Sequence, residues 1–428
     1  MNRAVAAFLS KHDFPLHTDV NVLTDSLLFD MNEGLAGRPS GEDMIKTYFN
    51  PSETAAASKS VIVIDAGGTN FRSCLVTFDA MGKPSIDFME KTSMPGIDRE
   101  LSKKEFFASL AQNLEHLKDK ASCIGFCFSY PMTITEDGDG ILIGWSKEIK
   151  APQVVGCQIG KELKAALKEN GWKNIEKITL LNDTVAALLA GAAGPNEGER
   201  YSSYIGFILG TGMNAAYIQG EDKELNIKKQ IVVCESGRFD KIASSSFDKA
   251  YDAKSVTPGT SIMEKHCSGG YLGPVCWEVL NTAAKEALFS KSFCQSLLEI
   301  QSLTLIEVSA FLQSPYSTAS VLGAKAAESA SDEDYDKLFQ LLDAVVERSA
   351  RCAAAILCAC VIQSGQGKHA AKPVCILCNG TTFYKTYKVK SRVEGYLDEL
   401  LVNQRGLYYE IISRENDITL GAAIGGLI

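Results

Sequence analysis

The sequence predicts an α/β protein built from two similar lobes, and three observations carry this prediction. At 428 residues the chain is too long for one ordinary hydrophobic core. Its 46% hydrophobic and 22% charged residues are typical of a globular protein. A pattern of strand, glycine-threonine turn and strand occurs twice, near residues 61–78 and 203–219, with helices between. We therefore expect two α/β lobes with a cleft between them.

The first pattern follows a helical stretch that ends near Pro51. Residues 61–64 form a β-branched run typical of a buried strand, which breaks at residues 65–70. Alternation then predicts a strand over 71–78 and a third strand near 86–89. Apolar residues at helical spacing predict a helix over 103–117, and residues 123–128 read as another buried strand.

The second pattern places strands at 203–209 and 214–219 around a turn at 210–212. Residues 282–362 are mainly helical in pattern, a strand follows at 374–378, and a glycine-rich segment closes the chain. We expect the small lobe to comprise residues 58–182 plus 416–428, and the large lobe residues 1–57 plus 183–415.

Charge and cysteine usage narrow the class of protein. A formal net charge of -9 disfavours duplex nucleic acid and anionic membranes as partners. The start lacks a signal peptide, and the longest apolar stretch, 352–362, is short of the roughly 20 residues of a membrane span. The 13 cysteines read as reduced thiols, and Cys375 and Cys378 lie in a strand, where they point to opposite faces and cannot share a zinc ion. These features predict a soluble cytoplasmic enzyme.

The two glycine turns are the first candidates for chemistry. The turn at 65–70 lets the backbone approach a ligand closely. It is neither a Walker A loop nor a Rossmann turn. Either turn alone is more simply an ordinary hairpin, but two of them, with Asp65 ending the first strand, favour a ligand-binding site.

Several motifs in register resemble the hexokinase–glucokinase family. The resemblance rests on Ile64–Arg72, Phe128–Pro131, Trp145–Lys147, Leu181–Ala186, Gly210–Ala215, Cys234–Gly237, Pro258-Gly259 with Glu264-Lys265, and Asn379–Lys385. The match runs from Met31–Leu35 to the final glycines, so it covers nearly the whole chain. It implies a two-lobed actin-like (ribonuclease H-like) fold, Mg-ATP as donor and a hexose 6-hydroxyl as acceptor. A monomer or a homodimer is expected.

The resemblance assigns catalysis to Asp183 and Lys147. Asp183 follows a buried run and opens an alanine-rich helix, where a carboxylate can take the proton of the attacking hydroxyl. Its simpler alternative is a helix N-cap. Lys147 would support negative charge on the phosphoryl group in transfer, and alone it would read as a solvated surface lysine.

The resemblance also supplies the binding residues, because a hexose is a ring of hydroxyls that requires amides, hydroxyls and carboxylates. The sugar set is Ser129, Ser146, Lys147, Asn182, Asp183, Asn214, Glu235 and Glu264. The nucleotide set is Asp65, Gly67, Gly68, Thr69, Asn70, Arg72, Gly210, Thr211, Gly212, Gly380, Thr381 and Thr382.

Two members of the nucleotide set have structural alternatives. Asp65 would hold Mg²⁺ through a water molecule, or else it only caps the turn. Arg72 would anchor the phosphate loop or lie near the phosphates, or else it forms a structural ion pair.

Three departures from the family pattern concern the sugar. Ser146 replaces a threonine, Ser236 a tryptophan, and Pro274 a glutamate, which affects sugar preference more than activity. A non-catalytic hexose sensor on the same fold is the alternative function. A transcriptional regulator is disfavoured because no basic helix-turn-helix precedes Val61.

Overall fold

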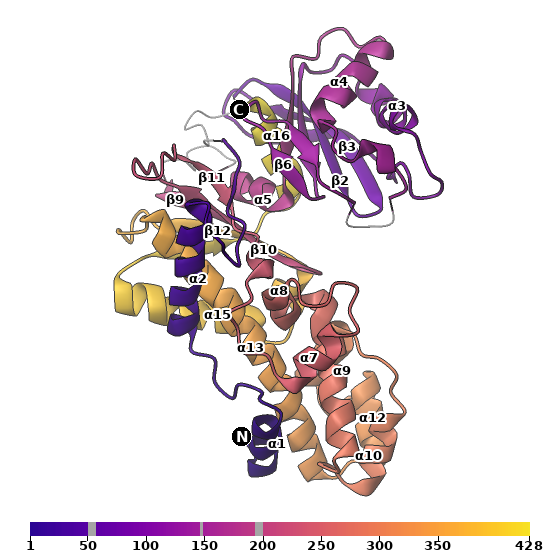
Figure 1. The fold of residues 1–428 in the computed structure, drawn as a ribbon, viewed down its shortest axis with the longest axis vertical. Coiled ribbons are helices and arrows are strands. Elements are labelled where there is room, and N and C mark those ends of the chain that lie inside the picture. Colours follow the sequence, from indigo (N-terminus) through magenta and orange to yellow (C-terminus); the bar gives the residue numbers. More distant parts are fainter. Residues whose placement is uncertain (50–56, 146–148, 193–199) are drawn as a thin grey trace.

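A computed structural model describes residues 1–49, 57–145, 149–192 and 200–428 (Figure 1). The chain opens with α1 (Arg3–Lys11) and α2 (Val20–Leu35), each preceded by a side chain that accepts from the first-turn N–H groups, Asn2 and Asp19. A short strand β1 (Ile45–Lys46) follows. The N-terminus and the C-terminus lie at opposite ends of the molecule.

A five-stranded sheet with the order β4-β3-β2-β5-β8 forms the core of one lobe. It consists of β2 (Ser60–Gly67), β3 (Asn70–Phe78), β4 (Pro84–Ser93), β5 (Cys123–Phe128) and β8 (Lys177–Leu181). One face packs against α3 (Lys103–Asn113) and α4 (Ile159–Glu169), and the other packs against α16 (Asp417–Leu427). Both faces of the central strands β2 and β5 are covered, so these strands are largely apolar, as expected for buried strands, whereas the edge strand β4 is mostly exposed. Shorter elements complete this lobe: η1 (Glu115–Leu117), η2 (Pro152–Val154), β6 (Met132–Ile134) and β7 (Gly140–Leu142).

A six-stranded sheet with the order β1-β11-β10-β9-β12-β13 forms the core of the other lobe. Its remaining strands are β9 (Ser203–Leu209), β10 (Met213–Gln219), β11 (Gln230–Val233), β12 (Val374–Asn379) and β13 (Tyr409–Ile412). In both sheets a hairpin pairs antiparallel across a glycine turn, and its first strand pairs parallel with a later strand. The repeated strand, turn and strand pattern predicted from the sequence is therefore confirmed.

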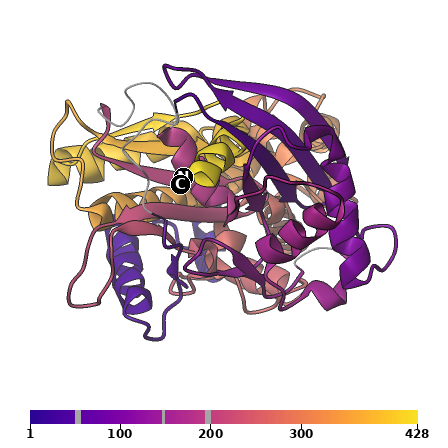
Figure 2. The same ribbon diagram turned by 90° about the horizontal axis from the view of Figure 1, so that it is seen from above.

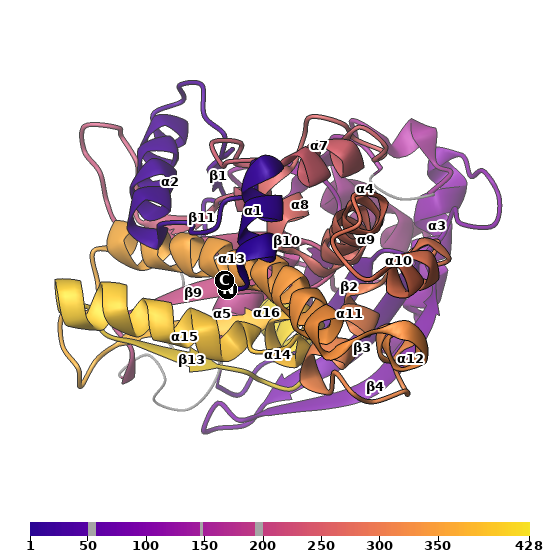
Figure 3. The same ribbon diagram turned by 90° about the horizontal axis from the view of Figure 1, so that it is seen from below.

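Helices fill the region beyond the six-stranded sheet, and Figures 2 and 3 show them from above and from below. The longest, α13 (Asp332–Ser364), begins with a Ser331–Asp334 capping box and ends at Gly365, whose φ of 65° suits a glycine C-cap. It runs beside α15 (Val389–Leu397) in Figure 3. The other elements are η3 (Ser236–Arg238), α7 (Ser246–Asp252), α8 (Ile262–Cys267), α9 (Gly269–Lys285), α10 (Lys291–Leu298), α11 (Leu305–Gln313), α12 (Val321–Ser329), α14 (Thr381–Lys385) and η4 (Asp398–Asn403).

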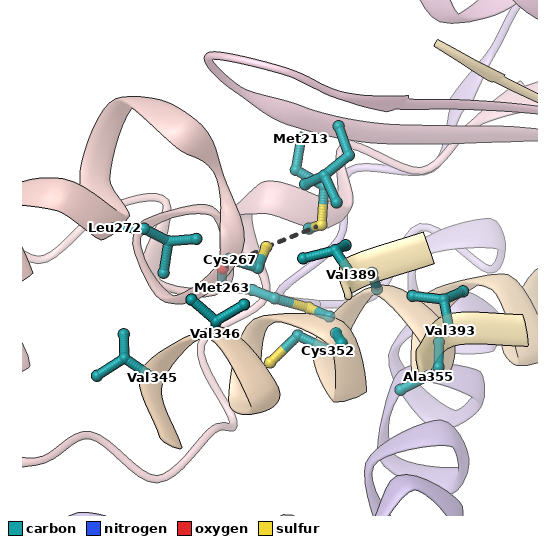
Figure 4. Close-up of a cluster of buried hydrophobic side chains, with 14 of the residues drawn as sticks. Met213, Met263, Cys267, Leu272, Val345, Val346, Cys352, Ala355, Val389 and Val393 are labelled. Atoms are coloured by element: carbon teal, nitrogen blue, oxygen red, sulfur yellow. Dashed lines mark hydrogen bonds between the residues drawn. The ribbon is translucent and has the colours of Figure 1, made fainter. Parts of the chain in front are cut away.

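The core where α13 meets α8 and β10 is rich in sulfur (Figure 4). Cys267 of α8 donates a weak hydrogen bond to the Met213 sulfur at 3.1 Å. Both side chains are buried, as are Met263 and Cys352 beside them. Soft, adaptable sulfur side chains fill irregular space well in such a core. This packing fixes α8 beneath the start of β10.

All 13 cysteines are free, as expected from the sequence. Cys375 and Cys378 of β12 belong to different hydrophobic clusters, so they point to opposite faces of the sheet as predicted. Over the described ranges no group of three or more His, Cys, Asp or Glu side chains is arranged to hold a metal ion.

Helix α5 (Asp183–Gly191) lies between the two sheets. It packs on β9 and against α16, and both contacts are made through glycine. A Cβ on Gly206 of β9 would lie 2.2 Å from the Thr184 carbonyl oxygen, and one on Gly421 of α16 would lie 1.7 Å from that of Ala186. Only glycine allows approaches this close.

None of the helices in the described parts of the chain is long and apolar enough to cross a membrane. The lobe boundaries given above remain a prediction.

Candidate active site

Asp183 lies where β8 ends and α5 begins. The N-cap of α5 is Asn182, whose side chain accepts from the Thr184 N–H at 2.7 Å. Asp183 accepts from the Thr184 hydroxyl at 3.1 Å. The capping role considered for Asp183 therefore belongs to its neighbour, and Asp183 is the first residue of the helix, where the helix dipole favours an ionised carboxylate.

Asp65 and Arg72 face each other across the β2–β3 hairpin. Arg72 Nη1 lies 3.1 Å from Asp65 Oδ2, so the structural ion pair considered for Arg72 is present. Burial raises the pKa of Asp65, whereas Arg72 lowers it and the charge of Asp417 raises it further. The carboxylate is 18% exposed, which leaves it accessible to a water molecule.

The turn after Asp65 is supported from the β5–β6 connection. Gly68 has a φ of 68°, and its carbonyl accepts from the Tyr130 hydroxyl at 2.7 Å. A Cβ on Gly67 would lie 3.3 Å from the Ser129 hydroxyl oxygen. Thr69 accepts from the Met94 N–H through its carbonyl. Candidate sugar and phosphate residues are thus in contact here.

The second glycine turn, at residues 210–212, and a third turn, at residues 379–382, form one unit. The Thr382 hydroxyl donates to the Gly210 carbonyl at 2.8 Å. Gly380 has a φ of 121°, and a Cβ there would lie 2.1 Å from the Leu209 carbonyl oxygen, so no larger residue fits. Thr211 accepts through its carbonyl from the Ser268 hydroxyl and the Gly270 N–H at the start of α9.

Three of the predicted sugar residues gather at the start of β10. Asn214 Nδ2 donates to Glu235 Oε1 at 2.8 Å, and Glu264 Oε1 accepts from the Met213 N–H at 3.0 Å. Glu235 adopts the left-handed conformation with φ 54°, a strained backbone of the kind that collects at functional sites. Burial raises the pKa of Glu235 to about 7, with Asp183 among the charges that contribute. Burial also raises the pKa of Glu264.

Two further polar residues lie at the site: Asn379, which opens the Asn379–Lys385 motif, and Asp417, which the sequence reasoning did not select. Asn379 donates to Asp417 at 2.5 Å, which links the end of β12 to the start of α16. Burial raises the pKa of Asp417. The charges of Asp65, Asp183 and Asp417 all act on the buried Cys127 thiol, which places these three carboxylates around one region. The only signal in the sequence was the position of Asp417 just before the closing glycine segment.

Ser146 and Lys147 lie outside the described residues. The preceding residue, Trp145, donates from Nε1 to the Ala151 carbonyl at 2.8 Å. Its ring packs edge-on against that of Tyr130, with centroids 5.0 Å apart. Trp145, the residue just before Ser146 and Lys147, therefore lies next to Tyr130, which supports the Gly68 turn. Of the remaining members of the predicted sets, Asn70 begins β3, Gly212 lies in the turn between β9 and β10, and Thr381 begins α14.

Comparison with known proteins gives the same family over both halves of the chain. Two family models described as hexokinase match residues 5–193 and 204–428. Hexokinase-1 of Schizosaccharomyces pombe is 26% identical over 94% of this chain and 86% of its own length. Hexokinase-5 of Oryza sativa is 28% identical over 93% of this chain and 85% of its own length.

Solved structures show the fold. A Schistosoma mansoni hexokinase complexed with glucose superposes with a TM-score of 0.77 at 23% identity, over 100% of this chain and 99% of that chain. A second hexokinase crystal structure gives a TM-score of 0.79 at 22% identity, over the full length of both chains. The predicted two-lobed actin-like α/β fold is confirmed, and membership supports phosphorylation of a hexose by ATP. The chain belongs to the hexokinase family.

Proposed function

We propose that this protein transfers the terminal phosphoryl group of Mg-ATP to the 6-hydroxyl of a hexose, with glucose the first expected acceptor. The product would be a hexose 6-phosphate, the entry compound of glycolysis. The observation that carries the proposal is the position of Asp183. It opens α5 near the partly buried Glu235 and Asn214 pair, and Asn182 already serves as the helix cap.

The sugar would be held by the polar side chains at the start of β10. Asn214 and Glu235 already bond to each other, so they are fixed before a ligand arrives, which limits the entropy lost on binding. Glu264 is oriented by the Met213 N–H. Ser129, Ser146 and Asn182 complete the proposed set of hydroxyl and amide contacts.

The nucleotide would lie along the three glycine turns. Thr382 and Ser268 fix the second and third turns against each other and against the start of α9, and Tyr130 supports the first turn. Backbone N–H groups of these turns can therefore reach phosphate oxygens without side chains in the way. Asp65, partly exposed and paired with Arg72, fits the role of holding a magnesium-bound water, because Mg²⁺ prefers oxygen ligands and keeps most of its water shell. Mg²⁺ supplies charge neutralisation on the phosphates when bound.

Asp183 would take the proton of the sugar 6-hydroxyl while the hydroxyl oxygen forms its bond to the γ-phosphorus of ATP. The bond between the γ-phosphorus and the ADP oxygen would break, and ADP would leave with its electrons. Such a base contributes a factor of about 10²–10⁴ in rate. Lys147 would place its ammonium beside the transferred group, where negative charge is spread over three oxygens.

Replacement of the proposed base tests this function. Asp183→Ala should retain sugar and ATP binding, measured by calorimetry, while kcat falls about 10²–10⁴-fold. ADP release across a panel of hexoses, with ATP, GTP and polyphosphate as donors, identifies the acceptor and the donor. A variant with near-parental turnover would remove Asp183 as the base. A parent protein that binds hexose but releases no ADP would instead support a sensor.

A further inference from the structure

Glu42 is a buried acid that the proposed mechanism does not use. It lies in the connection between α2 and β1, and its residue is 1% exposed. Within the described residues neither of its carboxylate oxygens has a hydrogen-bond partner. An ionised carboxylate without a partner is strongly disfavoured in such a place, so the protonated form is favoured.

The groups around Glu42 do not favour its ionisation. Burial raises the pKa of this carboxyl well above its ordinary value of 4.5, and Cys360 of α13 and Asp30 of α2 raise it further. Tyr217 of β10 and Cys234, the residue that follows β11, lie near it on the side of the sheet. Asp30 is itself paired with Lys241.

The segment that contains Glu42 contacts the chain on both sides of Glu235. Before Glu235, the Met44 N–H donates to the Cys234 carbonyl at 3.4 Å, and β1 continues this contact by pairing with β11. After Glu235, Arg238 Nη1 lies 2.6 Å from Asp43 Oδ2. Residues 42–46 therefore hold the strained backbone of Glu235 in place, and the buried side chain of Glu42 anchors this segment to the core.

We propose that Glu42, in its protonated form, is a positioning residue for the sugar site: it seats residues 42–46 against the segment that carries Glu235, and loss of its proton weakens sugar binding. This inference rests on the proposed function of Glu235 as a sugar ligand. Ionisation would place a second negative charge beside Asp30 and behind Glu235. The segment would then move toward solvent, and Glu235 would lose its support.

The first test measures stability and does not depend on activity. The unfolded chain releases the Glu42 proton near pH 4.5, whereas the folded protein keeps it. The folded state therefore binds more protons, and the wild type loses stability relative to an uncharged variant as pH rises through this window. The folding equilibrium constant of Glu42→Gln, divided by that of wild type, should therefore rise by up to about tenfold for each pH unit above 4.5. This rise ends at the pH where Glu42 of the folded wild type ionises.

Urea unfolding of wild type, Glu42→Gln and Glu42→Met between pH 5 and 9 measures this difference. Glu224→Gln makes the same chemical change on an exposed side chain and should run parallel to wild type. Glu42 variants that are less stable than wild type at pH 7, or that fail to fold, would show that the folded protein needs the charge and would overturn the proposal.

The second test measures sugar binding. The ratio of the KM for glucose in wild type to the KM in Glu42→Gln should rise at least threefold between pH 7 and 9, with similar kcat values because Asp183 is untouched. Glu235 titrates in both proteins, so the difference between them reports Glu42 alone. Parallel KM profiles up to pH 9 would overturn the positioning role.

The two tests also separate this proposal from the proposed function. A wild type that phosphorylates none of the hexoses contradicts the function, and the unfolding series then still decides the protonation state of Glu42. An active wild type whose pH profiles match those of Glu42→Gln contradicts only the role of Glu42.

Discussion

Adding a single methyl group to Gly206 of β9, where the strand packs on α5, should lower both the stability of the folded protein and kcat. In Gly206→Ala the new Cβ would lie 2.2 Å from the Thr184 carbonyl oxygen and 2.6 Å from the Leu188 nitrogen. Ordinary contacts begin near 3.4 Å, so the backbone of α5 must move by about 1 Å. Both blocking atoms belong to the helix backbone, so no side-chain rotation can relieve the clash.

The magnitude follows from that displacement. Overpacking of this kind costs about 1–3 kcal/mol of unfolding free energy. Thr184 follows Asp183 directly, so the proposed base moves with the helix, and a misplacement of about 1 Å costs about 100-fold in rate. Urea unfolding and kcat at saturating glucose and ATP measure the two effects separately.

Gly395→Ala is the matched control. Gly395 lies in α15 with no atom within 4 Å of the added Cβ. The same substitution should therefore stabilise the protein by about 0.5–1 kcal/mol through helix propensity and leave kcat unchanged. If Gly206→Ala matched its parent in both stability and kcat, the close contact between β9 and α5 would be wrong.

Three further predictions concern other parts of the molecule. Arg348→Met should lower the free energy of unfolding in urea by about 3–5 kcal/mol, because it leaves the buried Asp248 without its two hydrogen bonds from Arg348 at 2.7 and 2.8 Å. A loss below about 1 kcal/mol would contradict this prediction. The KM for glucose should fall as pH rises through about 7, because burial holds the pKa of Glu235 there and the carboxylate accepts hydrogen bonds more strongly than the acid. Glu235→Gln should abolish this pH dependence. If the pH dependence persisted in the variant, it would belong to another group. Tyr130→Phe removes the hydrogen bond to Gly68 and should cost about 1 kcal/mol of stability. It should also raise the KM for ATP more than the KM for sugar. Equal changes in the two KM values would argue against a phosphate-loop role.

The longer strands were predictable because their patterns are local, whereas β6, β7, β11 and β13 were not predicted. A buried β-branched run identified β2, an apolar run identified β5, and the paired glycine turns identified both hairpins. Strand β1 was not predicted, because two residues in a polar stretch carry no periodicity and the strand exists only through pairing with β11. Local sequence signals cannot show contacts that form only in the folded protein.

The same limit applies to the site. Motif order indicated the candidate residues, but the bond between Asn379 and Asp417 joins positions 38 residues apart. Glu42 lies among Gly, Pro, Ser and Asp residues, a composition typical of an exposed loop. Its burial results from how α2 and β1 are brought together, and no pattern in that stretch predicts it.

The two glycines that contact α5 also bear on how the sequence can vary. Gly206 of β9 and Gly421 of α16 contact α5 from two different elements, and neither position has room for a Cβ. In a saturation library selected for sugar phosphorylation, we expect these two positions to reject every substitution, alanine included, although neither carries a functional group. Intolerance at a position would then identify a backbone contact as readily as it identifies a reacting side chain.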